Sequence, residues 1–161
     1  MTPVAISGAK LGWGITDAAH IVAVEVDRGS GEVRATDAAV ALAAGPIFTP
    51  QQATSQVHGA FARGLGEALL EARITDPATG IVTTDSYDDY RLMRMSEAPN
   101  IEVAFLEDTY DYTPSGGSGI AELAITSIPA AVANAVADAT GWRPRRMPIT
   151  ADDVVAGLGH T

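Results

Sequence analysis

The sequence contains no cysteine and only three histidines, His20, His58 and His160. Without cysteine the chain forms no disulfide and holds no thiolate-ligated zinc ion or iron–sulfur cluster. The three histidines stand too far apart in the sequence for a zinc motif. The residues themselves therefore predict no metal ligands in this chain.

Basic residues are also scarce, because ten Lys and Arg stand against twenty Asp and Glu, for a formal net charge of −10. A nucleic-acid or anionic-lipid surface needs clustered cations, so we expect neither nucleic acid nor membrane as a partner. No apolar run reaches membrane-spanning length, and the N-terminus lacks the basic and apolar segments of a signal peptide. These absences favour a soluble cytoplasmic protein.

The composition and the local patterns predict one domain over residues 1–161. The length and a hydrophobic content of 47% suit a single domain with its own core. β-branched residues indicate a strand over 20–27, and a turn with two glycines leads into a second strand over 32–42. Together the two segments predict a β-hairpin.

The rest of the chain predicts helices and further strands of an α+β fold. Apolar residues recur at helical spacing over 51–72, behind Thr49 as N-cap and Pro50 at the first helical position. This arrangement predicts hairpins in a mixed or mostly antiparallel sheet with helices packed on one side. The other expected elements are a second hairpin (72–74 with 81–83), a polar loop over 85–91, a strand over 100–107, a helix ending near 140 before Gly141 as its C-cap, and a helix over 151–156 behind Thr150.

Three glycines gather within the stretch 113–124, at positions 116, 117 and 119, and Glu122 follows them. Glycines let backbone N–H groups approach a ligand closely, and the start of the next helix favours anions. A carboxylate at such a place could act as a general base beside a bound cofactor. The alternative is an ordinary surface loop that carries a glutamate.

Other polar residues have a plain structural alternative. His20, at the mouth of a strand, is interpreted as structural. Asp88 and Asp89 could suggest a metal site, but neighbours in sequence rarely converge on one ion, which favours a solvated loop. The arginines of the stretch 142–148 could bind an anion such as phosphate, or they could neutralise acidic neighbours.

Several segments in register carry a family resemblance. Gly119-Ile-Ala-Glu122 resembles a Gly-x-Gly-Glu signature, and Gln56-Val-His-Gly59 with Gly64-Leu-Gly66 resembles a glutamine- and glycine-containing helix. The other matching segments are the hairpin 20–42, the stretches 89–91 and 94–103, the helix 129–136 with its cap 139–141, and 146–149 as a closing strand. Together they resemble the C-terminal part of the molybdopterin-binding large subunit of the xanthine dehydrogenase/aldehyde oxidase family, in particular the isoquinoline 1-oxidoreductase β subunits.

The resemblance implies a role for each residue of the glycine loop. In this family the glutamate that matches Glu122 is the general base beside the molybdenum, on a loop shielded from water, and the loop amides hold the molybdopterin cofactor. The residues that match those cofactor-binding positions are Gly117, Ser118, Gly119, Ile120 and Ala121. The implied activity is hydroxylation of an aldehyde or an N-heterocycle, with the iron–sulfur clusters on a separate subunit.

The sequence departs from the family pattern in the loop and in length. Ala121 stands where the family usually has glycine, Leu123 where it has proline, and Ser118 where some branches have lysine. The methyl group of Ala121 falls where the backbone should approach the cofactor or adopt a positive φ. Because the family's large subunit is several times longer, this chain could supply only one wall of the site. It would need a companion molybdopterin-binding chain, or self-association.

Three hypotheses follow from these observations. The chain is a separately encoded part of a molybdenum hydroxylase that is inactive alone, or a non-catalytic domain that acts as an interaction or small-molecule-binding module, or a gene fragment that still folds. The presence of Glu122 favours the first hypothesis. Ala121 and the missing regions favour the second.

Overall fold

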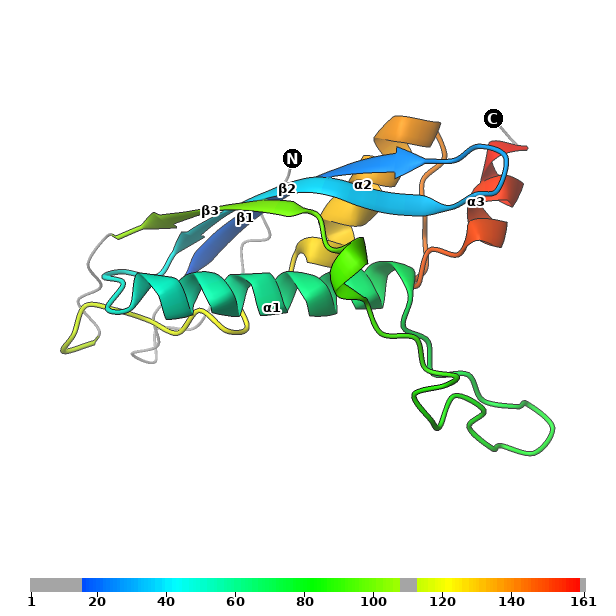
Figure 1. Ribbon diagram of the computed structural model, residues 1–161, viewed down its shortest axis with the longest axis horizontal. Helices are drawn as coiled ribbons and strands as arrows, with labels where there is room; N and C mark the ends of the chain where they lie inside the picture. The colour runs from blue at the N-terminus through cyan, green and yellow to red at the C-terminus, as the bar shows by residue number, and fades with distance from the viewer. Residues whose placement is uncertain (1–15, 108–112, 160–161) are drawn as a thin grey trace.

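A three-stranded sheet with helices on one face forms the body of the molecule (Figure 1). The computed structural model describes residues 16–107 and 113–159. None of the helices in these ranges is long and apolar enough to cross a membrane. In chain order the elements are β1 (Asp17–Val26), β2 (Val33–Ala43), α1 (Pro50–Leu69), a 3-10 turn (Met95–Glu97), β3 (Asn100–Leu106), α2 (Ile128–Thr140) and α3 (Ala151–Leu158).

The sheet is mixed, with β2 in the middle. β1 pairs antiparallel with β2, and β3 pairs parallel with β2, with Val40 opposite Val103. The register of β1 and β2 shifts between Ala23 and Val24. Such a bulge changes which side chains face one side of the sheet, so Ala35 and Ala38 are both buried although they are three residues apart.

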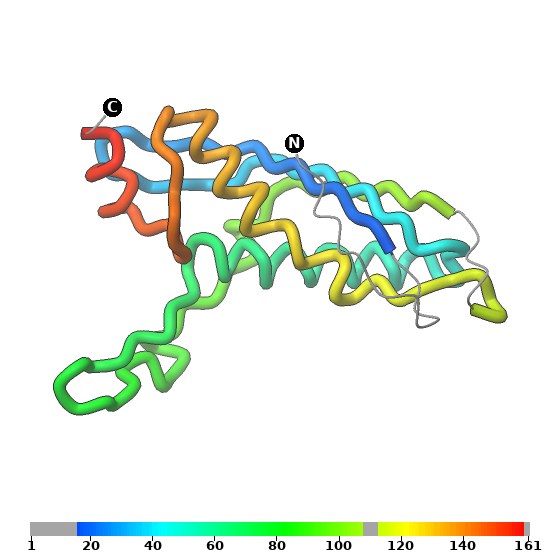
Figure 2. The backbone as a smooth tube through the Cα atoms, turned by 180° about the vertical axis from the view of Figure 1, so that it is seen from behind, coloured from blue at the N-terminus to red at the C-terminus, as the bar shows by residue number. Residues whose placement is uncertain are grey.

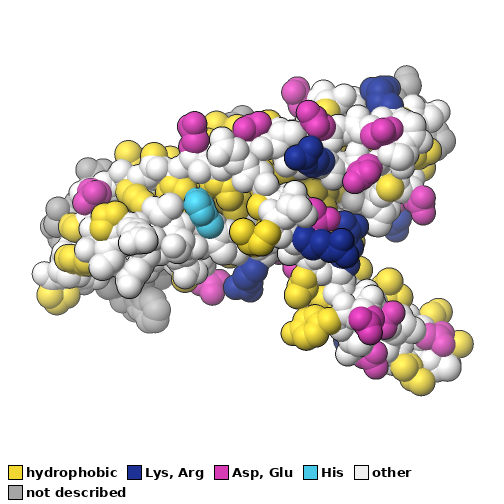
Figure 3. Space-filling model, viewed as in Figure 1, with side chains coloured by type: hydrophobic (Ala, Val, Ile, Leu, Met, Phe, Trp, Pro, Cys, Tyr) yellow, Lys and Arg dark blue, Asp and Glu magenta, His cyan; other side chains and the backbone are white. Residues whose placement is uncertain are grey.

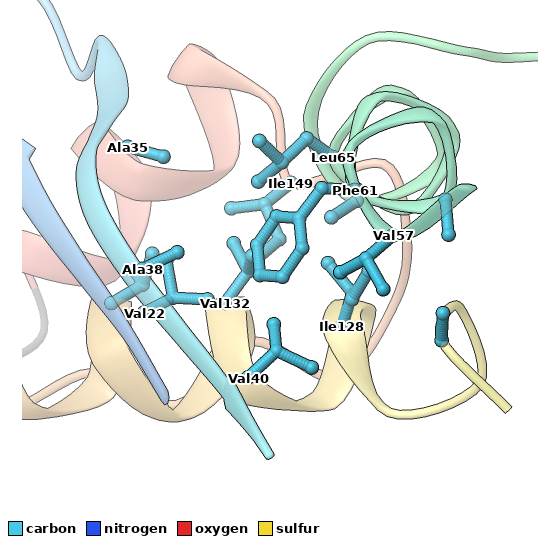
Figure 4. Packing of buried hydrophobic residues seen from close by; sticks show 14 of the residues in the cluster. Val22, Ala35, Ala38, Val40, Val57, Phe61, Leu65, Ile128, Val132 and Ile149 are labelled. Atoms are coloured by element: carbon cyan, nitrogen blue, oxygen red, sulfur yellow. The ribbon is translucent and has the colours of Figure 1, made fainter. Parts of the chain in front are cut away.

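The core lies between the sheet and the two longer helices. α1 packs against α2 and β3, while α2 packs against β1, so both helices cover the same face of the sheet. Phe61 points from α1 into the middle of this cluster (Figure 4). Close packing of α1 on α2 depends on Gly64, because an added Cβ would stand 2.7 Å from the Cβ of Ile128. The α+β fold with a mixed sheet, predicted from the sequence, is therefore confirmed.

The ends of the helices follow their capping residues. Thr49 precedes α1 with Pro50 as the first helical residue, Gly141 closes α2 with φ of 80°, and the Thr150 hydroxyl accepts a hydrogen bond from the Asp153 N–H. α1 ends at Leu69 and not at Ala72, because the N–H groups of residues 70 and 71 both turn back to the Gly66 carbonyl.

Two expected β elements are wrong or much reduced. The second hairpin consists of a single bridge between Thr75 and Val82 in an otherwise irregular segment. The stretch 146–149 forms no strand; Pro148 has no N–H for a ladder, and the Ile149 N–H donates to Ala68 at the end of α1.

Residues 72–94, which we term the arm, project away from the body (Figures 1 and 2). No residue of the arm belongs to the fully buried core cluster, and only Met93 packs partly against it. The arm is therefore an appendage to the fold and not a part of its core.

Candidate functional site

The glycine loop lies beside the connection between β2 and α1. The Ser118 N–H donates to the Ala44 carbonyl at 2.8 Å, which joins the loop to the end of β2. A Cβ at Gly117 would stand 3.4 Å from both the Pro46 carbonyl and the ring of Phe48. Figures 1 and 2 both show this yellow segment near the N-terminal end of α1. Residues 44–48, which the sequence interpretation did not single out, thus support the loop.

A tight turn shapes the first half of the loop. The Gly116 N–H donates to the Thr113 carbonyl at 3.1 Å, and the Thr113 hydroxyl donates to the Gly117 carbonyl at 2.9 Å. Gly116 has a φ of 72°, a conformation that glycine adopts without the steric cost of a side chain. The glycine at this position is therefore required by the turn itself.

The second half of the loop presents free backbone donors. Ile120 and the residues after it form successive turns that lead into α2, beginning with the hydrogen bond from the Ala124 N–H to the Ile120 carbonyl at 3.1 Å. Within residues 16–107 and 113–159 the N–H groups of Gly119, Ile120 and Ala121 have no acceptor. Gly119 and Ala121 are exposed, and a Cβ at Gly119 would meet no atom of the described residues within 4 Å. Three consecutive amides are thus available to an acceptor from outside.

Glu122 follows these amides and is exposed. Its carboxylate makes no ion pair or hydrogen bond with any residue in the described part of the chain. The expectation that this carboxylate is shielded from water is therefore not met, since Glu122 is exposed in the structure. The carboxylate is free to accept a hydrogen bond from an incoming group.

His20 fixes the far end of the loop to the sheet. The residue is 5% exposed, and Nε2 lies 2.9 Å from the Ala124 carbonyl while Nδ1 lies 2.5 Å from the Ser127 hydroxyl. Since a carbonyl only accepts, Nε2 carries a proton and donates it to Ala124. Nδ1 of the neutral ring then accepts a hydrogen bond from the Ser127 hydroxyl. Burial lowers the pKa of His20, against a smaller raising effect of the Ala124 carbonyl, and favours this neutral form.

The structure thus supports the interpretation of His20 as structural and shows what it holds. One imidazole on β1 joins the turn after Glu122 to the residue just before α2. The ring also packs against Phe61 of α1, with 5.9 Å between ring centroids. No local pattern in the sequence indicated this link, because the partners lie 104 and 107 residues away.

The alanine at position 121 carries no backbone strain. Among the described residues no residue other than glycine has a positive φ, so the turn at Ala121 does not demand glycine. The side chain of Ala121 lies on the exposed surface of the loop. Ser118 is half-buried, with its N–H committed to Ala44.

The other candidate residues lie elsewhere and have local partners. Asp89 accepts a hydrogen bond from the Ser86 hydroxyl, and no group of three or more His, Asp or Glu side chains in the described chain could hold a metal ion. In the basic stretch Arg146 pairs with Asp153, and Arg143 donates to Asn134. The ion pair with Asp153 favours neutralisation of an acidic neighbour over anion binding at Arg146. A cavity of about 190 Å³ lies between the start of β2 and the end of α1, at the opposite ends of these elements from the glycine loop.

The amino-acid sequence matches a known protein family and several characterised relatives. A family model described as the molybdopterin cofactor-binding domain matches residues 10–99, more than half of the chain. The aldehyde oxidoreductase molybdenum-binding subunit PaoC of Escherichia coli K12 is 39% identical over 144 residues, which cover 89% of this chain and 20% of PaoC. The large subunit of nicotine 6-hydroxylase from Paenarthrobacter nicotinovorans is 33% identical over 139 residues, 84% of this chain and 17% of that protein.

The fold is also similar to that of a solved structure. Quinoline 2-oxidoreductase from Pseudomonas putida 86 superposes with a TM-score of 0.80 at 30% identity, over 84% of this chain and 18% of the larger one. The chain therefore spans a fifth or less of the length of these proteins.

Proposed function

This chain belongs to the molybdopterin cofactor-binding domain family, and from that premise we propose that it forms one wall of the cofactor site in a molybdenum-dependent oxidoreductase. The proposed reaction is hydroxylation of an aldehyde or an N-heterocycle, the substrates named in the relatives PaoC and quinoline 2-oxidoreductase. One observation carries the proposal: three unpartnered amides stand directly before an unpartnered carboxylate on a loop that is anchored at both ends.

The residues of the loop fit such a cofactor. A pterin and its phosphate carry oxygen and nitrogen acceptors, which suit consecutive N–H donors at the start of a series of helical turns. The open space at Gly119 admits close approach to the backbone. When bound, the molybdenum cofactor supplies the two-electron redox chemistry, and the protein supplies binding and orientation.

The loop residues divide this work between them. Gly119, Ile120 and Ala121 donate to the cofactor, whereas Gly117 and Ser118 maintain the shape of the loop, because Gly117 packs on Pro46 and Ser118 is bonded to Ala44. Glu122 is the general base, and its carboxylate oxygen takes the proton from the oxygen nucleophile that attacks the electron-poor substrate carbon.

The remainder of the site comes from other chains in this proposal. This chain corresponds to the C-terminal segment of a molybdopterin-binding subunit, and a companion chain supplies the missing walls, since a fifth of the relatives' length cannot enclose the cofactor. The iron–sulfur clusters reside on a separate subunit, because this chain has no cysteine to ligate them. We place the assembly in the cytoplasm.

The test is co-purification of the tagged chain from its native host, with mass spectrometry of the bound chains and elemental analysis for molybdenum. We expect a larger molybdopterin-binding partner and stoichiometric metal. Glu122→Gln should then reduce turnover by about a hundredfold or more while molybdenum content stays unchanged, because the base is lost and the amides remain. Recovery of a metal-free chain without a companion would contradict the proposal.

The second candidate is a non-catalytic domain of the same fold that binds a partner or a small molecule. The exposure of Glu122 favours it, since no element of the described chain encloses this carboxylate. The same purification separates the two functions. A non-catalytic domain would bind its partner without molybdenum, and Glu122→Gln would leave the amount of bound partner unchanged.

A further inference from the structure

The arm exposes an unusual concentration of large apolar side chains. Of the ten such side chains that are strongly exposed in the described residues, four lie on the arm: Ile74 at 55%, Ile81 at 64%, Tyr87 at 86% and Leu92 at 47%. Met95, at 91%, stands at its foot. Single exposed apolar residues are ordinary, but a group of them on one projection indicates a surface that another molecule covers.

Hydrogen bonds of its own keep the arm in shape. The Asp76 N–H donates to Ile81 and the Thr83 N–H to Ile74, both at 2.8 Å. The Tyr90 hydroxyl donates to the Glu71 carboxylate at 2.6 Å and ties the arm to the end of α1. An arm that is ordered before contact loses little conformational freedom on binding, which favours a specific interface.

The negative charge of the arm indicates which kind of surface its partner presents. From Asp76 to Tyr90 the sequence contains four aspartates and no Lys or Arg, whereas Arg73, Arg91 and Arg94 stand at the foot. Figure 3 shows magenta and yellow side chains along the arm and dark blue ones where it joins the body. A surface that receives the outer part of the arm therefore needs an apolar groove with a basic rim.

The comparisons indicate where such a surface is found. The family match over residues 10–99 spans the whole arm, so the arm lies inside the matched domain. In relatives about five times as long, the same domain is part of a much larger polypeptide. In such relatives, the polypeptide outside the matching segment is therefore available to pack on the apolar side chains of the arm.

We propose that the arm is the docking element through which this chain joins a companion molybdopterin-binding polypeptide, with Ile81 and Tyr87 inserted in an apolar groove whose rim carries Lys or Arg. This inference rests on the proposed function only for the identity of the partner. It requires neither bound cofactor nor catalysis.

The test uses a partner of known sequence. PaoC from which the 144-residue segment matching this chain has been removed is co-expressed with the full chain, without added molybdate, and the two are co-purified. We expect a complex in which the amides of residues 74–92 exchange hydrogen at least tenfold more slowly than in the isolated chain. Glu122→Gln should form the complex as well as the wild type, which separates docking from catalysis.

Two variants of one kind locate the contact. Ile81→Asp should weaken the complex at least tenfold, and Tyr87→Asp should act alike. Ile21→Asp on the exposed face of β1 is the matched control, since Ile21 is 62% exposed and Ile81 64%. Circular dichroism of each isolated variant checks that it folds.

Four outcomes would overturn the proposal. They are the absence of a complex with the wild-type chain, a complex whose arm exchanges as fast as in the free chain, equal loss of binding in the Ile21 and Ile81 variants, and protection of the arm by a second copy of this chain in the absence of PaoC. A molybdenum-free complex with a protected arm would leave the docking inference intact even if the proposed enzymatic function failed.

Discussion

At the residue scale, His20 decides where the end of the glycine loop lies. It makes two hydrogen bonds from a nearly buried ring, and both partners lie within five residues of Glu122. His20→Ala should reduce the free energy of unfolding by about 2–4 kcal/mol, because it removes these bonds and leaves a cavity beside Phe61. Urea denaturation measures this change, and amide exchange at residues 119–125 should become faster.

The control for this substitution is His58→Ala. His58 is exposed on α1 and belongs to none of these contacts, so the free energy of unfolding should stay within about 0.5 kcal/mol of the wild type. Equal effects at the two histidines would show that His20 does not anchor the loop.

The same ring makes stability depend on pH. Burial holds the pKa of His20 in the folded chain below the value of about 6.5 expected when it is unfolded. The unfolded chain then binds a proton that the folded chain does not, so the free energy of unfolding is highest above pH 6.5 and falls as the pH is lowered towards the folded pKa. Urea titrations between pH 7.5 and 5 should show this decline, and His20→Gln should flatten it. A wild-type free energy of unfolding that rises as the pH is lowered from 7.5 to 5 would contradict the buried, neutral state of His20.

Sequence reasoning singled out the glycine loop and Glu122 as a candidate site but did not predict what surrounds them. Glycines followed by an acid can be recognised within a dozen residues, so the loop and Glu122 were accessible from the sequence alone. The anchor at His20 was not, because hydrogen bonds to Ala124 and Ser127 join segments more than a hundred residues apart. The sequence also left open whether Glu122 is shielded or exposed, since this depends on how distant segments pack around the loop.

At the element scale, glycines on α1 have opposite consequences according to what they face. A Cβ at Gly64 would overlap Ile128 of α2, whereas one at Gly59 would meet nothing within 4 Å. Gly64→Ala should lower the free energy of unfolding by about 1–3 kcal/mol through overpacking, although alanine favours the helix. Gly59→Ala should raise it by up to about 1 kcal/mol through helix propensity alone. Thermal and urea unfolding of both variants check the pair, and a stabilising Gly64→Ala would refute the close contact of α1 and α2.

Local sequence patterns predicted the helices and strands, whereas their arrangement depends on long-range contacts. Alternation in β3 and the apolar face of α1 were visible in the sequence because each is a repeating pattern within one segment. The parallel pairing of β3 with β2 was not, because partners such as Val40 and Val103 are joined by no turn whose sequence could specify the register. The second hairpin was predicted from its turn residues, which are present. Its two short segments bury too little apolar surface to extend the pairing beyond the single bridge between Thr75 and Val82.

At the scale of the whole molecule, we expect the arm to contribute little to the stability of the body. The fully buried core comes from β1, β2, the helices and the turns next to them, and none of it from residues 72–94. The Thr83 nitrogen lies 2.8 Å from the Ile74 carbonyl oxygen, a spacing that a two-residue Gly-Ser turn in place of residues 75–82 can bridge.

This replacement should leave the free energy of unfolding within about 0.5 kcal/mol of the wild type, as for a change outside the core. Phe61→Ala, at the centre of the body and fully buried, should cost about 3–5 kcal/mol in the same urea titration. The contrast has a physical reason: the outer arm is held by its own hydrogen bonds, whereas Phe61 joins the sheet to both long helices. A replacement that unfolds the chain would mean that the arm supports the body. A body of unchanged stability would show that residues 75–82, including the exposed Ile81, are not needed for the fold.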